Sequence, residues 1–225
     1  MMDLAALLDQ RRSVRAYLPT PVPQAEVAAI LTAARQAPSG ANLQPGHFVA
    51  LTGAPFAALQ AALAEGIATD RPQVSEYSYF PDPMPAVLKA RQRAAGYGLH
   101  ATLGVDRRDV AGRRAQFARN YSFFDAPVGI VVTIDRAMGK GCYMDLGMAL
   151  MALFLAATAR GYATTGIGAL AHYGDLVHET LKLPEDQLVV CGIALGLADP
   201  KAPVNGFRTD RADLAAYARF DGFCD

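Results

Sequence analysis

The sequence predicts a protein of the mixed α+β class. Three short runs rich in β-branched or aromatic residues, at residues 47–51, 128–134 and 188–195, are bounded by Gly, Pro and Asp, which is typical of strands. Between them lie segments with helical character. We expect all three strands to be central ones. No internal repeat, low-complexity tract or Ser/Gly linker marks a boundary, so we expect one domain over residues 1–225.

Two helices are expected before the first strand. Asp3 can cap a short helix that continues to about Gln10. A second helix begins at residues 20–23, and its apolar residues recur at the spacing of one helix face: Val27, Ile30, Leu31 and Ala34. It must end before Pro38, because the residue that precedes a proline is pushed out of the helical region. Residues 38–40 are therefore expected to form a loop.

Residues 144–160 predict a later helix that is apolar nearly all round. A helix has this character when protein surrounds it, either inside a domain or in a subunit interface. Gly161 follows as the expected C′ residue. The stretch 69–120 differs, because it is rich in Tyr, Pro and Arg and offers only amphipathic pieces at 86–95 and 109–118. We expect this stretch to be an excursion that covers another part of the molecule.

The composition excludes several classes of protein. The chain is 52% apolar and 19% charged, and 21 basic residues balance 21 acidic ones, so it is neither disordered nor a nucleic-acid binder held by bulk charge. The longest nearly uncharged apolar run, residues 146–159, is shorter than the roughly 20 residues that span a membrane. Residues 1–12 show neither a secretory nor a twin-arginine signal. We therefore expect a cytoplasmic protein with no membrane partner.

The cysteines and histidines argue against a metal enzyme. Cys142, Cys191 and Cys224 are odd in number, lie far apart and form no C-x-x-C pair, so neither a disulfide framework nor a zinc site is expected. His172 and His178 are six residues apart, which does not bring two side chains to one helix face. We expect reduced cysteines in the core or the tail.

Four segments offer groups that could bind a ligand. Residues 11–15, RRSVR, place three guanidinium groups and a hydroxyl within five residues, which suits the oxygens of a phosphate. The alternative is a solvated helix end. Residues 38–48, PSGANLQPGHF, form a polar loop between a helix and a strand, where ligands are often held. An ordinary turn would use the same residue types.

The other two segments lie late in the chain. Residues 164–173, TTGIGALAHY, contain two glycines that let the backbone approach a flat ligand, and the alternative is a plain glycine turn. Their G-x-G-x-x-A spacing follows a long helix, so it lacks the strand-to-helix context of a dinucleotide fingerprint. Residues 205–214 place Arg208 and Arg211 near the C-terminus, where a solvated tail is the ordinary interpretation.

Together and in this order, the segments resemble the flavin-dependent nitroreductase family, most closely its para-nitrobenzoate-reductase-like branch. The resemblance covers RRSVRAY, PSGANLQP, YMDLGMALMALFLAATARGYAT, GIGALAHY, LKLPEDQLVVCGIALG and the tail N-x-F-R-T-D-R-A-D-L. It is weaker over about residues 54–120. It implies a nitroreductase-like fold, in which helices surround a central, mainly antiparallel sheet and a helical excursion covers the active site. It also implies a homodimer with two FMN molecules at its interface.

The resemblance assigns cofactor contacts to four groups of residues. In the N-terminal group, Arg11 and Ser13 match phosphate ligands and Arg15 matches a residue at the pyrimidine edge of the flavin; Arg12 belongs to the same group. The loop expected from the partner subunit comprises Pro38, Ser39, Asn42 and Gln44. The backbone beside the reactive nitrogen of the flavin comprises Thr165, Gly166, Ile167 and Gly168. In the tail, Arg211 matches the second arginine that binds the phosphate, and Arg208 is the alternative match.

The implied activity is that of an FMN-dependent oxidoreductase. NADH or NADPH would reduce the flavin, and a nitroaromatic, a quinone or a similar planar acceptor would then take the electrons in a ping-pong sequence. The flavin carries this chemistry, so no catalytic side chain is assigned. One alternative within the family is reduction of another electrophile, or flavin chemistry such as dehalogenation or ring fragmentation. The others are a non-catalytic flavin-binding or storage protein and a non-flavin domain that binds some other small phosphate.

The sequence departs from the family pattern at Gly46. Many members have Trp after the Gln-Pro pair, whereas Gly46 follows Pro45 here and the chain contains no Trp. This difference removes bulk near the loop. The aromatic residues between 77 and 124 could stack on a planar substrate, but such side chains more often belong to a core or an interface, so the predicted site omits them.

Overall fold

The chain folds around a four-stranded sheet, seen in a computed structural model that describes residues 3–223. The strands are β1 (His47–Leu51), β2 (Val128–Asp135), β3 (Ala163–Ile167) and β4 (Gln187–Gly196). Their order in the sheet is β1-β2-β4-β3, and every neighbouring pair is antiparallel. The predicted α+β class and antiparallel sheet are confirmed.

Two of the strand predictions need correction. The run 47–51 forms β1, but β1 pairs only with β2 and is therefore an edge strand, not a central one. Residues 164–173 were expected to form a glycine segment and no strand was predicted there, yet residues 164–167 belong to β3, which pairs with β4 along its whole length. Gly166 disfavours a strand locally, and pairing with the buried, apolar β4 outweighs that preference.

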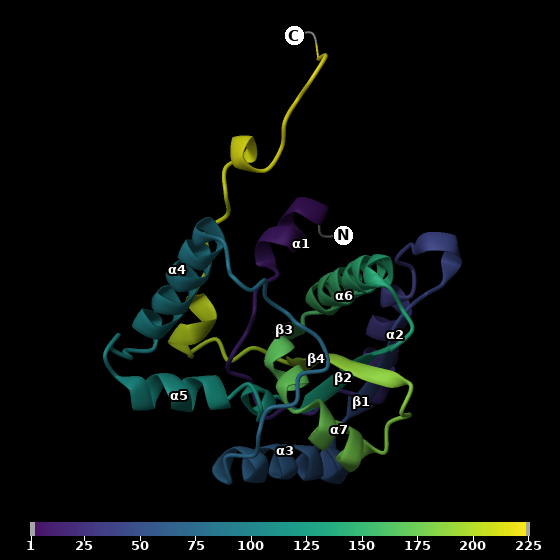
Figure 1. The fold of residues 1–225 in the computed structure, drawn as a ribbon, viewed down its shortest axis with the longest axis vertical. Helices are drawn as coiled ribbons and strands as arrows, with labels where there is room; N and C mark the ends of the chain where they lie inside the picture. The colour runs from purple at the N-terminus through teal and green to yellow at the C-terminus, as the bar shows by residue number, and fades with distance from the viewer. Residues whose placement is uncertain (1–2, 224–225) are drawn as a thin grey trace.

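Helices cover both faces of the sheet (Figure 1). One face packs against α2 (Gln24–Ala34) and α6 (Lys140–Ala159), and the other packs against α3 (Gly53–Ala68) and α7 (Gly174–Leu181). Successive residues of a strand point to opposite faces. Accordingly Ile130 and Val132 of β2 join the core under α2 and α6, whereas Val131 joins the core under α3 and α7. The three layers hold the sheet as a rigid platform.

The remaining helices lie outside these layers. The first, α1 (Leu4–Gln10), begins after Asp3 as predicted, although the Asp3 side chain makes no capping hydrogen bond. The amphipathic pieces of the excursion form α4 (Ala86–Thr102) and α5 (Val110–Ala118), neither of which contains a buried residue. Five short 3-10 helices complete the described chain: η1 (Gly40–Asn42), η2 (Phe123–Asp125), η3 (Gly168–His172), η4 (Pro203–Gly206) and η5 (Leu214–Ala216).

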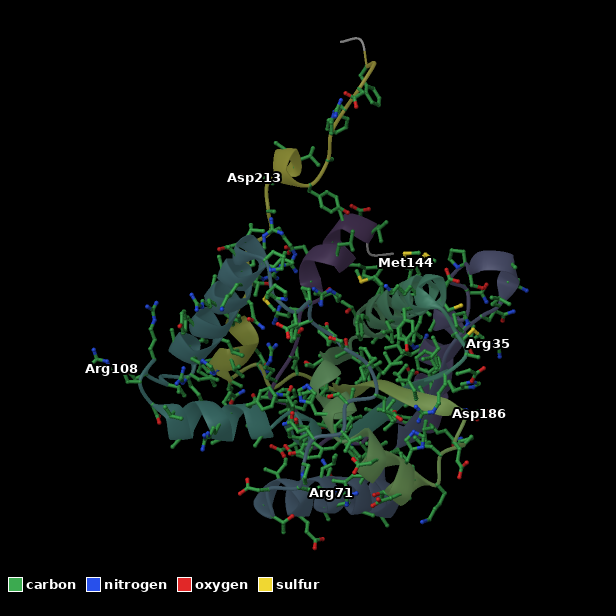
Figure 2. All side chains as sticks on the ribbon, viewed as in Figure 1. Arg35, Arg71, Arg108, Met144, Asp186 and Asp213 are labelled. Atoms are coloured by element: carbon green, nitrogen blue, oxygen red, sulfur yellow. The ribbon has the colours of Figure 1, made fainter. Side chains whose placement is uncertain are left out.

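The apolar helix α6 has two different faces. Leu146, Leu153 and Ala157 lie in the core shared with α2. Met144 on the outer face is 71% exposed and points away from the sheet (Figure 2). By length and composition alone α6 is apolar enough to cross a membrane, but its inner face packs as a core helix does. Gly161, at φ +81°, follows the helix end as expected of a C′ residue.

The described cysteines are unpaired, in line with the predicted reduced state. Cys191 lies on β4, and burial raises the pKa of its thiol to about 12. Cys142 is half-buried at the start of α6. Cys224 lies outside the described residues. A thiol with so high a pKa is protonated at neutral pH and behaves as a small apolar core residue.

Gly129 on β2 tests how tightly the layer under α3 is packed. A Cβ atom at this position would lie 2.2 Å from Cε2 of Phe56, whose ring is buried. We expect Gly129→Ala to lower the free energy of unfolding by about 1–3 kcal/mol, because overpacking displaces neighbouring side chains. Urea unfolding followed by circular dichroism measures this change. Gly141→Ala, at an exposed position with no neighbour within 4 Å, is the control and should show no such loss.

Candidate flavin-binding site

Arginines from the two ends of the chain meet in one cavity of about 490 Å³, the arginine cavity. All predicted ligands of the N-terminal segment and the tail line it: Arg11, Arg12, Ser13, Arg15, Arg208 and Arg211. Residues almost 200 positions apart in the sequence are thus brought together. Sequence reasoning missed the α4 wall of the cavity, formed by Ala95, Gly96 and Leu99, because small and aliphatic residues carry no signal of ligand binding.

The N-terminal segment is held by the edge of the sheet. Ser13 forms an isolated parallel bridge with Thr164 of β3, and the Val14 N–H donates to the Thr164 carbonyl at 3.1 Å. Val14 is buried, and its carbonyl accepts a hydrogen bond from the Thr165 hydroxyl. The segment therefore extends the sheet beyond β3. Arg12 and Arg15, on either side of Ser13 and Val14, therefore extend from backbone that these hydrogen bonds hold in place.

Asn205 ties the tail to the same segment. Its side chain is buried, and its Oδ1 accepts from the Arg15 N–H at 2.9 Å. Its Nδ2 donates to the carbonyls of Ala16 at 2.8 Å and Asp199 at 2.9 Å. A buried amide is costly to leave without hydrogen-bond partners, so these three bonds of Asn205 hold the tail in a fixed position against the N-terminal segment. It opens the tail motif, but its role was not predicted.

The arginine cavity concentrates positive charge. Burial, followed by the charges of Arg211 and Arg208, lowers the pKa of Arg11. The Arg12 Nε is buried and has no hydrogen-bond partner among residues 3–223. Arg208 is partly engaged, since its Nη1 lies 3.0 Å from Asp9 Oδ1. Clustered cations and an unpartnered buried donor fit an anion with several oxygens, such as a phosphate monoester.

Arg15 occupies a different position from the other arginines. Burial lowers the pKa of its guanidinium, which lies 5.9 Å from the centre of the Phe124 ring. One of its nitrogens, Nη1, donates to the Ser13 carbonyl at 3.3 Å. The side chain is therefore held at the inner end of the cavity. A cation fixed there can stabilise negative charge on a ring that extends inward.

The glycine segment exposes main chain at the edge of the sheet. In β3, Thr165 and Ile167 are buried, whereas Gly166 between them is exposed. Gly168 begins η3, and a Cβ atom there would lie 3.1 Å from the Tyr79 ring. The surface that Gly166 and Gly168 offer is thus main chain, as a planar ligand stacked on the strand requires. Tyr79, from the excursion, borders this surface and was left out of the predicted site.

The polar loop lies apart from the arginines. Pro38, Ser39 and Gln44 line a separate cavity of about 260 Å³ beside α6, and no residue of the arginine cavity takes part in it. The loop is ordered by its own bonds: Gln44 N–H donates to Ser39 Oγ at 2.9 Å, and Asp145 accepts from Gly40 N–H at 3.0 Å. Within one chain, Pro38, Ser39, Asn42 and Gln44 are therefore not brought to the predicted ligands of the other segments.

The departure at Gly46 has a structural cause. Its backbone has φ +102°, which disfavours any residue with a side chain, and a Cβ atom would lie 2.6 Å from Cδ1 of Leu146. Leu146 is fully buried in the core. The loop therefore packs directly on α6 at Gly46, and a residue with a side chain here would force the loop or Leu146 to move.

The chain matches known proteins over nearly its whole length. The model of the nitroreductase family matches residues 8–197. The chain is 38% identical over 224 residues to a 4-nitrobenzoate reductase from Pseudomonas putida, covering 98% of this chain and 96% of that protein. It is 34% identical to a chloronitrobenzene nitroreductase from Comamonas testosteroni, with 95% of each chain covered.

Solved structures show the same fold. The FMN and NADPH-dependent nitroreductase NfnB from Sphigopyxis sp. strain HMH superposes with a TM-score of 0.96 at 37% identity, covering 99% of this chain and 100% of the other. The FMN-dependent nitroreductase NfnB from Mycobacterium smegmatis, solved in complex with NADPH, gives 0.91 at 31% identity, covering 97% and 100%. From its sequence and its fold alike, this chain belongs to the nitroreductase family.

Proposed function

We propose that this protein is an FMN-dependent oxidoreductase that uses NAD(P)H to reduce nitroaromatic, quinone or related conjugated acceptors in ping-pong order. The observation that carries the proposal is the convergence of Arg11, Arg12 and Arg211 on one cavity in a member of the nitroreductase family. Ser13, which also lines this cavity, is bridged to Thr164 on the strand that carries the exposed Gly166. Relatives at 38% and 34% identity are nitroreductases of nitroaromatic compounds.

Each part of the site has a role in this proposal. Arg11, Arg12, Ser13 and Arg211 hold the FMN phosphate, Arg208 supports them, and Arg15 lies at the pyrimidine edge. The backbone from Thr165 to Gly168 lies against the ring. When bound, FMN supplies hydride chemistry. The protein positions the ring, excludes water from one of its faces, and places a cation where negative charge develops.

We further propose that residues 1–225 form one domain that works as a cytoplasmic homodimer with shared sites. The polar loop of Pro38 to Gln44 cannot serve the arginine cavity of its own chain, so a second copy would supply it. The outer face of α6 supports this arrangement, because Met144 and Met148 are exposed beside the loop-bearing end of the helix. The chain after Leu214 also extends away from the sheet (Figure 1). Its aromatic residues Tyr217, Phe220 and Phe223 are exposed, and a partner could cover them.

Absorbance spectra test the proposed activity. We expect purified protein to bind FMN and its flavin spectrum to bleach on anaerobic addition of NADH or NADPH. Subsequent addition of nitrobenzoate should restore the oxidised spectrum. Bound flavin that no nicotinamide bleaches would instead indicate a storage protein. A protein that does not bind FMN would indicate that the arginines bind another phosphate.

The Arg11 side chain provides a direct test of the phosphate assignment. We expect Arg11→Ala to raise the Kd for FMN about 10- to 100-fold, because a charge-assisted hydrogen bond contributes roughly 1.5–3 kcal/mol. Quenching of flavin fluorescence on titration measures the Kd. Lys201→Ala removes one exposed positive charge elsewhere and should leave the affinity unchanged. An unaltered Kd for Arg11→Ala would remove this residue from the site.

Mixed dimers test whether two subunits share each site. Neither Arg11→Ala nor Asn42→Ala homodimers should retain FMN fully, since every site carries one defect. A heterodimer of the two variants, isolated with two different affinity tags, has one site with both defects and one with neither. We expect it to bind about one FMN per dimer with unaltered affinity. A heterodimer without any tight site would show that both residues act within the same chain.

A further inference from the structure

The excursion carries positive charge that the fold does not use. The α4–α5 segment, residues 86–120, contains eight basic and two acidic residues, although the whole chain has no net charge. Neither α4 nor α5 buries a residue, and both helices stand to one side of the sheet (Figure 1). Arg108 extends outward from the turn between them (Figure 2). So much like charge on one segment destabilises the folded state through self-repulsion, and a bound anion would relieve that repulsion.

The acidic residues of the α4–α5 segment do not neutralise this charge. Asp109 caps α5, where its Oδ1 accepts from the Gly112 N–H at 2.8 Å. Asp106 accepts from the Arg108 backbone N–H at 2.7 Å. Among residues 3–223, Arg119 pairs with Asp125 at 3.1 Å, and the other seven cations of the segment form no ion pair. The segment therefore presents uncompensated positive charge.

A cavity of about 830 Å³, the α5 cavity, opens beneath these helices. It shares Arg15, Gly96 and Leu99 with the arginine cavity, so the two adjoin. Arg113 and Arg114 of α5 line it together with Phe117 and Tyr121, and Asp70 is the one acidic residue of its lining. His100 also lines the α5 cavity, and its buried Nδ1 has no hydrogen-bond partner in the described part of the chain.

A contact with the tail fixes the position of α4, which lines both cavities. Gly98 lies so close to Phe207 of the tail that a Cβ atom would be 2.7 Å from Cε2 of that ring. Phe207 directly precedes Arg208 and itself lines the arginine cavity. The tail that carries the cavity's arginines thus also fixes the helix between the two cavities.

We propose that the α5 cavity binds the adenosine end of the electron donor, and that Arg113 and Arg114 hold its 2′-phosphate, so that the enzyme prefers NADPH to NADH. This inference rests on the proposed function. Seven uncompensated cations suit a polyanionic nucleotide better than an acceptor with one carboxylate. A 2′-phosphate adds about 1.5–2 negative charges. The rings of Phe117 and Tyr121 could stack on adenine. Arg15 lines both cavities, so a nucleotide in the α5 cavity would reach toward the proposed flavin site.

Flavin bleaching by each nucleotide tests the preference in the holoenzyme. In anaerobic stopped flow, we expect the double variant Arg113→Gln/Arg114→Gln to lose about 10- to 100-fold in the second-order rate constant for NADPH and little for NADH. The rate at saturating NADPH should stay unchanged, because the phosphate is remote from the transferred hydride and contributes uniform binding. Arg113→Lys/Arg114→Lys, which keeps the charge, should recover part of the loss.

The control removes the same charge from the same segment. Arg91→Gln/Arg93→Gln alters two exposed α4 arginines that line neither cavity. If the segment acts only by long-range attraction, both double variants will lower the second-order rate constant for NADPH equally. High salt will then abolish the loss relative to the unsubstituted protein. That outcome would overturn the assignment to Arg113 and Arg114. An NADPH to NADH ratio that stays the same in both variants would overturn it as well.

A binding measurement separates failure of this inference from failure of the proposed function. Calorimetric titration of the holoprotein with adenosine 2′,5′-bisphosphate and with adenosine 5′-monophosphate reports the 2′-phosphate contact without any electron transfer. We expect the bisphosphate to bind at least tenfold more tightly, and the advantage to vanish in Arg113→Gln/Arg114→Gln. Equal binding of the two probes contradicts the site even if both nucleotides bleach the flavin. Flavin that neither nucleotide bleaches contradicts the function, whatever the titration shows.

Discussion

The hydrogen bond from the Val14 N–H to the Thr164 carbonyl is the contact on which the arginine cavity depends. Arginine side chains repel one another, so they stay close together only where the fold holds them. Here the N-terminal segment is an added edge of the sheet, and Asn205 fastens the tail to it through buried hydrogen bonds. The free energy that gathers the cations therefore comes from the packed sheet and its two cores. Burial first, and then the nearby charges of Arg211 and Arg208, lower the pKa of Arg11 in this cavity.

The strand order makes this edge available. β2 and β4 are central and nearly continuous in buried residues, so they carry both cores. β3 can then remain short, with one side paired to β4 and the other beside Ser13. Thr164, Thr165 and Ile167 of this strand are buried, whereas Gly166 is exposed. The same strand thus anchors the arginines and presents the backbone surface that a flat cofactor needs.

Charged residues divide into two groups with different partners. Cations that support the fold are paired: Arg71 contacts Asp175 and Glu179, and Arg136 contacts Glu76, which also accepts from the Val189 N–H. Cations of the arginine cavity and of the α4–α5 segment lack such partners for the most part, Arg208 and Arg119 being exceptions. A neutral chain can therefore gather more cations than anions around these two cavities, where Asp9 and Asp70 are the acidic residues of the linings.

Local chemistry in the sequence was enough to predict α2 from its apolar spacing, β2 and β4 from their β-branched runs, and the end of α6 at Gly161. It also identified the segments that hold the arginines. It could not identify β3, because Gly166 has no strand preference until β4 pairs with it, nor recognise β1 as an edge strand.

By itself, then, the sequence determined which residues carry charge, which faces are apolar and where helices stop, since these depend on side chains a few positions apart. Only the tertiary structure decided that Arg211 meets Arg11, that Asn205 joins them, and that the loop of Ser39 lies apart from both. It also decided that α4 separates two adjoining cavities. These are contacts between residues distant in the chain, and their geometry is set by how the sheet, its two cores and the tail pack together.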